Sequence, residues 1–221
     1  MIPRIKICCI SSVEEAHLAV RSGAAALGLV SDMPSGPGVI PEPLIAEIAR
    51  VVPPGVSSFL LTAKQRADEI IAQHRRCRTS VIQLCDRPAD GTYHELREAL
   101  PGIALVQVIH VTGSEAVEEA LSAAPHINAL LLDSGNPTLA VKKLGGTGRT
   151  HNWEISREIR TRSQVPVFLA GGLNPDNVAE AVRLVEPFGV DVCSGVRTDG
   201  RLDERKLKMF VKSLQYLDVD S

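Results

Sequence analysis

Two adjacent cysteines stand where a thiol could do chemistry. Cys8 and Cys9 close the apolar run "RIKICC", which starts at Arg4. Cys8 would serve as a general base if a neighbouring cation, Lys6 or Arg4, favours its thiolate form. A free cysteine is also a common small apolar group of protein cores, so the residue alone leaves both roles open.

A single carboxylate ends another apolar run. Asp133 is the last residue of "INALLLD". A carboxyl group at such a position is partly withdrawn from water, which raises its pKa toward the range that suits a general acid. An aspartate that caps the following turn would look the same in the sequence.

Three stretches rich in glycine could bind a phosphate group. Glycines let backbone N–H groups approach an anion without interference from a Cβ atom. Each stretch alone is also consistent with a tight turn, and together they favour a phosphorylated small molecule as ligand. The stretches are "FLAGGLNP" with Gly171 and Gly172, "VCSGVR" with Ser194 and Gly195, and "GGTGRT" with Gly146 and Arg149.

These residues follow apolar runs that recur along the whole chain. Helical patterns separate the runs, with Ser12, Thr62, Ser114 and Asn174 as expected N-caps and Pro175 at a first helical position. The runs are 4–9, 25–30, 56–61, 80–84, 103–110, 127–132, 165–170 and 190–193.

Eight strand–helix units in 221 residues, about 27 residues each, predict a (β/α)8 barrel. An open doubly wound sheet is the alternative, but it would normally carry a glycine-rich turn after its first strand, where this chain has Cys9-Ile10-Ser11-Ser12. No linker-like stretch divides the sequence, so we expect one domain over residues 1–221. In such a barrel the catalytic residues lie where strands end and βα loops begin.

Composition excludes several classes of partner. A net charge of -2 and an aromatic content of only 3% argue against nucleic acid binding and against an anionic membrane surface. No apolar h-region or 18-residue apolar run occurs, so we expect a cytoplasmic protein with no membrane partner. The five cysteines are then expected to be free thiols.

Four segments together resemble phosphoribosylanthranilate isomerase, a barrel enzyme of the tryptophan pathway. The resemblance covers nearly the whole chain and is densest from Gly145 to the C-terminus. The segments are "KICCISSVEEAHLAVRSGAAALGLV", "LLLDS", "GGTGRTHNW" and "LAGGLNPDNVAEAVRLVEPFGVDVCSGVRTDGRLDERKL".

The resemblance implies an aldose–ketose isomerase that performs a cofactor-free Amadori rearrangement. It assigns the general base to Cys8 and the general acid to Asp133. The implied phosphate-binding residues are Gly146, Gly171, Gly172, Ser194 and Gly195, and the possible further substrate contacts are Lys6, Arg149, Asp191 and Arg197. The resemblance does not decide between a monomer and a homodimer.

The sequence departs from the family at the expected mouth of the barrel. The family's Lys-Ile-Cys-Gly reads Lys-Ile-Cys-Cys here, so Cys9 replaces a glycine. The family arginine that holds the anthranilate carboxylate aligns with Pro37. Either another cation, Arg149 or Arg197, binds the carboxylate, or the chain is a paralogue that accepts a different aglycone.

Two further alternatives remain open at the level of sequence. Soft ligands near strand ends could bind zinc, although their spacing matches no zinc motif, and we expect no metal. The altered mouth is also compatible with a barrel that binds a phosphosugar without turning it over. The zinc ligands would come from Cys8 or Cys9, Cys85, His110 and Cys193.

Overall fold

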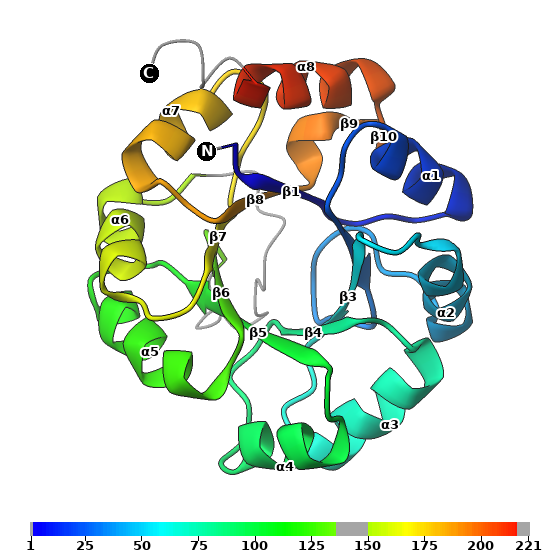
Figure 1. Ribbon diagram of the computed structural model, residues 1–221, viewed down its shortest axis with the longest axis vertical. Helices are drawn as coiled ribbons and strands as arrows, with labels where there is room; N and C mark the ends of the chain where they lie inside the picture. The colour runs from blue at the N-terminus through cyan, green and yellow to red at the C-terminus, as the bar shows by residue number, and fades with distance from the viewer. Residues whose placement is uncertain (1, 136–149, 216–221) are drawn as a thin grey trace.

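Eight parallel strands close into a barrel in strict sequence order, from β1 next to β2 through to β8 next to β1 (Figure 1). The structure is a computed structural model that describes residues 2–135 and 150–215. The (β/α)8 barrel expected from the sequence is confirmed. Its strands are β1 (Arg4–Ile7), β2 (Ala26–Val30), β3 (Ser57–Thr62), β4 (Val81–Leu84), β5 (Ala104–His110), β6 (Ala129–Asp133), β7 (Val167–Leu169) and β8 (Gly189–Val192).

Helices surround the barrel in a ring on the outside of its strands (Figure 1). A short hairpin of β9 (Arg197–Thr198) and β10 (Arg201–Leu202) follows the last barrel strand. The helices are α1 (Val13–Arg21), α2 (Glu42–Val51), α3 (Ala67–Cys77), α4 (Thr92–Ala99), α5 (Glu115–Ala123), α6 (Trp153–Arg162), α7 (Val178–Val185) and α8 (Glu204–Gln215), with short 3-10 helices η1 (Ala124–His126) and η2 (Ser194–Val196).

The expected helix caps were only partly correct. The Ser12 hydroxyl accepts a hydrogen bond from the Glu15 N–H, as a cap should, whereas Ser114 occupies the N-cap position without a side-chain bond. Thr62 is instead the last residue of β3, because the apolar strand pattern extends one residue further than expected.

The start of α7 was also misplaced. Asn174 closes a turn by accepting hydrogen bonds from the N–H groups of Asp176 and Asn177, and Pro175 lies inside that turn. The helix begins only at Val178. An Asx turn and a helix cap use the same residue types, so the sequence could not separate them.

Alternate residues of each strand face two different cores. In β2, Leu27 and Leu29 pack outward against the helices, whereas Ala26 and Val30 belong to the cluster inside the barrel. This is the period-2 alternation of a strand, with both faces buried because the sheet is closed and covered.

Aromatic rings and an ion pair fill the barrel interior. Phe59 and Phe168 meet edge to face, with ring centroids 6.2 Å apart. Lys6 of β1 and Asp191 of β8 are partners in the strand register, and the Lys6 ammonium lies 5.2 Å from the centroid of the Phe59 ring. The interior is therefore a packed core whose polar layer lies near the site described below. Within the described part of the chain, no helix is long and apolar enough to cross a membrane.

Candidate active site

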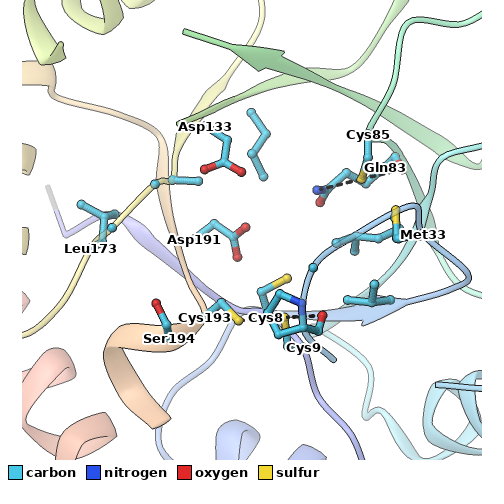
Figure 2. A pocket seen from close by; sticks show the side chains of 18 of the residues that line it. Cys8, Cys9, Met33, Gln83, Cys85, Asp133, Leu173, Asp191, Cys193 and Ser194 are labelled. Atoms are coloured by element: carbon cyan, nitrogen blue, oxygen red, sulfur yellow. Dashed lines mark hydrogen bonds between the residues drawn. The ribbon is translucent and has the colours of Figure 1, made fainter. Parts of the chain in front are cut away.

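A cavity opens at the carboxyl ends of the strands and encloses about 690 Å³ of space, including its open mouth. This is the end of the barrel at which chemistry was expected. Figure 2 shows carboxyl, thiol and amide side chains directed into it from several strands. The lining includes Cys8, Cys9, Val30, Met33, Ser35, Gly36, Pro37, Leu61, Gln83, Cys85, Leu131, Asp133, Ala170, Gly171, Gly172, Leu173, Asp191, Cys193 and Ser194.

Cys8 follows β1 directly and is 7% exposed. Its N–H donates to the carbonyl oxygen of Val192, so the strand pairing with β8 holds it in place. A Cβ atom built on Gly28 would lie 2.8 Å from Cys8 Sγ and 3.1 Å from Lys6 Nζ, which puts these two atoms at most about 6 Å apart. The thiol therefore lies between the cavity and a buried ammonium group, and it requires a glycine at position 28.

Asp133 ends β6 and is 7% exposed. Burial raises the pKa of its carboxyl group, although the Ser134 N–H, which donates to Oδ1 at 2.7 Å, opposes the shift. A carboxyl group that retains its proton more readily than a surface aspartate is suited to donate it to a substrate.

Lys6 and Asp191 form a buried ion pair below the cavity. Lys6 Nζ lies 3.0 Å from Asp191 Oδ1, and the side chains are 0% and 8% exposed. Burial disfavours the charged form of Lys6, but Asp191 and then Cys8 outweigh it and raise the pKa of the ammonium group. Asp191 lines the cavity, as expected of a substrate contact, whereas Lys6 is not among the lining residues.

The glycine-rich loops after β7 and β8 line another part of the cavity. Gly171 and Gly172 line it with φ angles of +81° and +64°, which a residue with a Cβ adopts only at a cost. The Asn177 side chain donates to the Gly172 carbonyl oxygen at 3.0 Å and so fixes the loop. Ser194 lines the cavity beside them, and these residues are brought together as the sequence predicted.

Gly195 lies just behind this loop and not in the lining. A Cβ atom there would lie 2.0 Å from the Leu173 carbonyl oxygen, so the loops after β7 and β8 pack backbone against backbone. Gly146 and Arg149, also expected at the site, lie outside the described residues.

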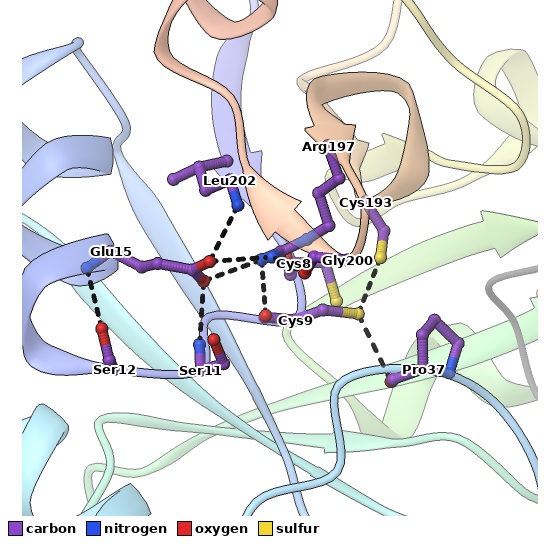
Figure 3. A network of polar contacts seen from close by, with 10 residues as sticks. All are labelled: Cys8, Cys9, Ser11, Ser12, Glu15, Pro37, Cys193, Arg197, Gly200 and Leu202. Atoms are coloured by element: carbon purple, nitrogen blue, oxygen red, sulfur yellow. Dashed lines mark hydrogen bonds and ion pairs between the residues drawn. The ribbon is translucent and has the colours of Figure 1, made fainter.

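Arg197 does not reach the cavity. Its guanidinium group forms an ion pair with Glu15 at 3.0 Å and donates to the carbonyl oxygens of Cys8 and Cys9 (Figure 3). Glu15 in turn accepts from the N–H groups of Ser11 and Leu202. Arg197 is therefore placed to position the end of β1, and as a substitute cation for the substrate it is badly located.

Cys9 occupies a left-handed backbone conformation, with a φ angle of +61°. This conformation favours glycine, the residue that the resemblance implies at this position, because a side chain in it costs about 1–2 kcal/mol. The loop after β2 packs closely over the residue: a Cβ atom on Gly38 would lie 2.5 Å from Cys9 Cβ.

Sequence reasoning missed Gln83 and Met33 as lining residues. Gln83 is 3% exposed, and its Oε1 atom has no hydrogen-bond partner among the described residues. It lies one residue before the end of β4, and the inward phase of that strand was the signal that could have found it.

A metal centre finds no support in the geometry. Among residues 2–135 and 150–215, no three His, Cys, Asp or Glu side chains are grouped so that they could hold an ion. His110, one of the ligands considered, has its Nε2 atom 3.0 Å from the Cys85 carbonyl oxygen.

The sequence pattern of a family described as N-(5'-phosphoribosyl)anthranilate (PRA) isomerase matches residues 5–213. The chain belongs to this family. It is 36% identical to N-(5'-phosphoribosyl)anthranilate isomerase of Methanocella arvoryzae, over 96% of this chain and 98% of the relative. It is 37% identical to N-(5'-phosphoribosyl)anthranilate isomerase 2 of Methanosarcina mazei, over 94% and 92%.

Solved structures of phosphoribosylanthranilate isomerases share the fold. The enzyme from Thermotoga maritima superposes with a TM-score of 0.82 at 30% identity, over 96% of this chain and 98% of that one. A second structure, with a TM-score of 0.80, 28% identity and the same coverage, is a complex with reduced 1-(o-carboxyphenylamino)-1-deoxyribulose 5-phosphate. The family expected from the sequence is thus confirmed, and so is the class of enzyme, an aldose–ketose isomerase.

Proposed function

We propose that this chain converts N-(5'-phosphoribosyl)anthranilate to the corresponding 1-deoxyribulose 5-phosphate, with Asp133 as the general acid and Cys8 as the general base. Two relatives that bear the name of this activity align with the chain over nearly their whole length. The observation that carries the assignment is that Cys8 and Asp133, from strands on different sides of the barrel, open onto one cavity.

The chemistry needs one proton donor and one proton acceptor. Asp133 protonates the ring oxygen of the furanose, and the ring opens to an iminium ion. Cys8, as thiolate, then removes the proton from C2′, and the resulting enolamine tautomerises to the ketone. No redox cofactor enters, because the electrons move only between neighbouring carbon atoms of the sugar.

The phosphate group would lie at the loops after β7 and β8. Gly171 and Gly172 leave backbone N–H groups accessible, and Ser194 adds a hydroxyl group on the same side. A phosphate fixed there holds the sugar between acid and base, which supplies much of the rate enhancement through orientation.

Turnover of the substrate, followed by the fluorescence change of the anthranilate ring, tests this assignment. We expect Cys8→Ala and Asp133→Asn each to lower kcat by about 10²–10⁴-fold, the usual contribution of a positioned acid or base, with little change in KM. Cys77→Ala is the matched control, because it removes a buried thiol from α3, outside the cavity lining. Either site variant retaining more than a tenth of wild-type kcat would contradict the roles assigned here.

A second candidate is the same isomerisation of a phosphoribosyl amine whose aglycone has no carboxylate. The cavity side formed by β2, β3 and β4 is uncharged in the described residues, with Val30, Met33, Pro37, Leu61 and Gln83. No lysine or arginine of the described chain lines the cavity, and Arg197 is held by Glu15. A carboxylate left without a charged partner binds at least about 2 kcal/mol more weakly, roughly 30-fold.

Comparison of two substrates separates the candidates. If the anthranilate carboxylate is recognised, kcat/KM exceeds that for N-(5'-phosphoribosyl)aniline by at least about 30-fold. If the two values are similar, or the aniline compound is preferred, the second candidate holds. Pro37→Arg should then raise kcat/KM for the anthranilate substrate alone.

A further inference from the structure

Two cysteines from opposite ends of the chain meet at the rim of the cavity. Cys9 Sγ and Cys193 Sγ lie 2.7 Å apart and share a hydrogen bond (Figure 3). Cys9 lies two residues after the end of β1 and Cys193 directly follows β8, and these two strands are paired neighbours in the barrel. Backbones of adjacent strands are spaced within the range that a disulfide bridges, and an S–S bond of about 2.05 Å needs a sulfur shift of less than 1 Å.

The two thiols differ in a way that suits disulfide exchange. Cys193 is half-buried and lines the cavity, so a small reagent can reach it. The hydrogen bond with Cys9 lowers the pKa of Cys193 despite its burial, and the Arg197 cation acts in the same direction. The same bond, with burial, raises the pKa of Cys9, which is 5% exposed. An accessible thiol of lowered pKa beside a second thiol is the arrangement of redox-sensitive cysteine pairs.

We propose that Cys9 and Cys193 are a redox modification site, at which a low-molecular-weight disulfide oxidises the pair to a reversible Cys9–Cys193 disulfide. The Cys193 thiolate attacks one sulfur of the reagent and expels a thiolate, which leaves a mixed disulfide on Cys193. Cys9 then gives up its proton and attacks the Cys193 sulfur, which expels the second thiol. Overall the two protein thiols lose two electrons and two hydrogens, and the reagent gains them as two free thiols.

Cys8 is not the partner in this pair. Its sulfur is directed toward the space above Gly28 and toward Lys6, on the inner side of the strand end. The Cys9 sulfur instead faces Cys193 and the Pro37 carbonyl oxygen, 3.6 Å away. Cys9 also shares a side-chain hydrogen bond with Cys8, but a disulfide between adjacent residues is strained, so the bond between Cys9 and Cys193 would leave Cys8 reduced.

The disulfide has a consequence for turnover that rests on the proposed function. Closing the bond pulls Cys193 toward β1, and Cys193 directly precedes Ser194 at the phosphate side of the cavity. Small displacements of a substrate-positioning segment can change rates by up to about 100-fold. We expect the oxidised protein to show a KM at least threefold higher, restored by dithiothreitol.

Mass spectrometry after treatment with oxidised glutathione tests the bond itself, independently of any activity. The whole protein should become lighter by two hydrogens, and three of its five thiols should remain titratable in denaturant. After trypsin digestion without reduction, peptide 7–21 should be joined to peptide 184–197. Activity measured on the same sample tests the effect of oxidation on KM separately. Failure of the proposed function would therefore leave the evidence for the Cys9–Cys193 bond unchanged.

Single variants identify which thiols react. Cys9→Gly, which suits the left-handed backbone, and Cys193→Ser should both abolish the cross-linked peptide pair. Cys8→Ala and the control Cys77→Ser should both retain it, and far-UV circular dichroism verifies that each variant is folded. Persistence of the cross-link in Cys9→Gly, or no loss of two hydrogens in the wild type, would overturn the proposal.

Discussion

Removal of the ammonium group of Lys6 should destabilise the fold strongly, because it leaves a carboxylate without its partner inside the barrel. Lys6→Met keeps a long flexible side chain of similar length. The Lys6 side chain is 0% exposed and that of Asp191 is 8% exposed, so water cannot replace the lost partner.

The magnitude follows from the geometry of the pair. Opposite charges 3.0 Å apart attract by about 5–6 kcal/mol at an effective dielectric constant of 20. Desolvation of two ions costs several kcal/mol each, so the pair as a whole adds little to stability. If only Lys6 is replaced, the desolvation cost of the buried Asp191 carboxylate remains without the attraction that offset it. Lys6→Met should therefore lower the free energy of unfolding by about 3–5 kcal/mol at pH 7.

Urea unfolding of Lys6→Met, Asp191→Leu and the double variant, compared with the wild type in a double-mutant cycle, measures this loss of stability. Asp191→Leu alone should also be costly, because Lys6 is then unpaired, whereas the double variant should lie within about 2 kcal/mol of wild type. In Lys6→Met the pKa of Asp191, already raised by burial, is no longer held down by the ammonium group. Because the pKa of Asp191 is raised in the folded variant, ionisation of Asp191 destabilises the fold as the pH rises. The free energy of unfolding of Lys6→Met should therefore lie closer to that of the wild type at pH 5 than at pH 8.

Two results would refute this reasoning. A loss of less than 1 kcal/mol in Lys6→Met at pH 7 would mean that water or another group already solvates Asp191. A deficit independent of pH would mean that the loss comes from packing of the lysine stem and not from charge. The double variant distinguishes these cases, because additive losses indicate packing and compensating losses indicate charge.

Three other variants test separate parts of the fold and site. Hydrogen bonds from Arg197 hold the pKa of Glu15 below its usual value in spite of burial, so its stabilisation is present at neutral pH and is lost as the pH falls through that lowered pKa. Glu15→Gln should cost about 1.5–3 kcal/mol in urea at pH 7 and progressively less as the pH is lowered into the acid range. Gly195→Ala should lower the free energy of unfolding by several kcal/mol and raise KM, because its Cβ atom would lie 2.0 Å from a backbone oxygen. The control Gly23→Ala should lose only about 1–2 kcal/mol, because Gly23 has a φ angle of +95° but open space around it. Asp133→Asn should unfold at pH 7 with an equal or higher urea midpoint while it loses turnover, because burial disfavours the ionised carboxyl group that the substitution removes.

Periodicity was sufficient to predict the barrel, because a closed parallel sheet imposes one pattern eight times. The same argument placed Asp133, Gly171 and Gly172 at one end, since all carboxyl ends of a parallel barrel meet there. It could not place Thr62 or Asn174 correctly, because caps, turns and strand ends use the same residue types and only backbone geometry separates them.

The direction in which a side chain points was harder to predict than its place in the chain. Arg197 follows β8 closely, yet its guanidinium group turns to Glu15 on α1, which is distant in sequence. The meeting of Cys9 and Cys193 depends on two facts that no local pattern contains: closure of β8 on β1 and the positive φ angle of Cys9. Long-range closure and local strain therefore decided the details of this site.

The strain at Cys9 allows a last prediction, which concerns why a cysteine stands there. Cys9→Gly should relieve about 1–2 kcal/mol of backbone strain, lose about 1 kcal/mol of buried side chain, and lose about 0.4–1 kcal/mol through the more flexible unfolded chain. These terms nearly cancel, so the free energy of unfolding, measured in urea under reducing conditions, should change by less than about 1 kcal/mol. A cysteine that adds no net stability must be explained by its thiol, which is the group that meets Cys193. A loss of more than 2 kcal/mol in Cys9→Gly, with the same loss avoided by Cys9→Ser, would instead show that packing under the Pro37 loop accounts for the residue.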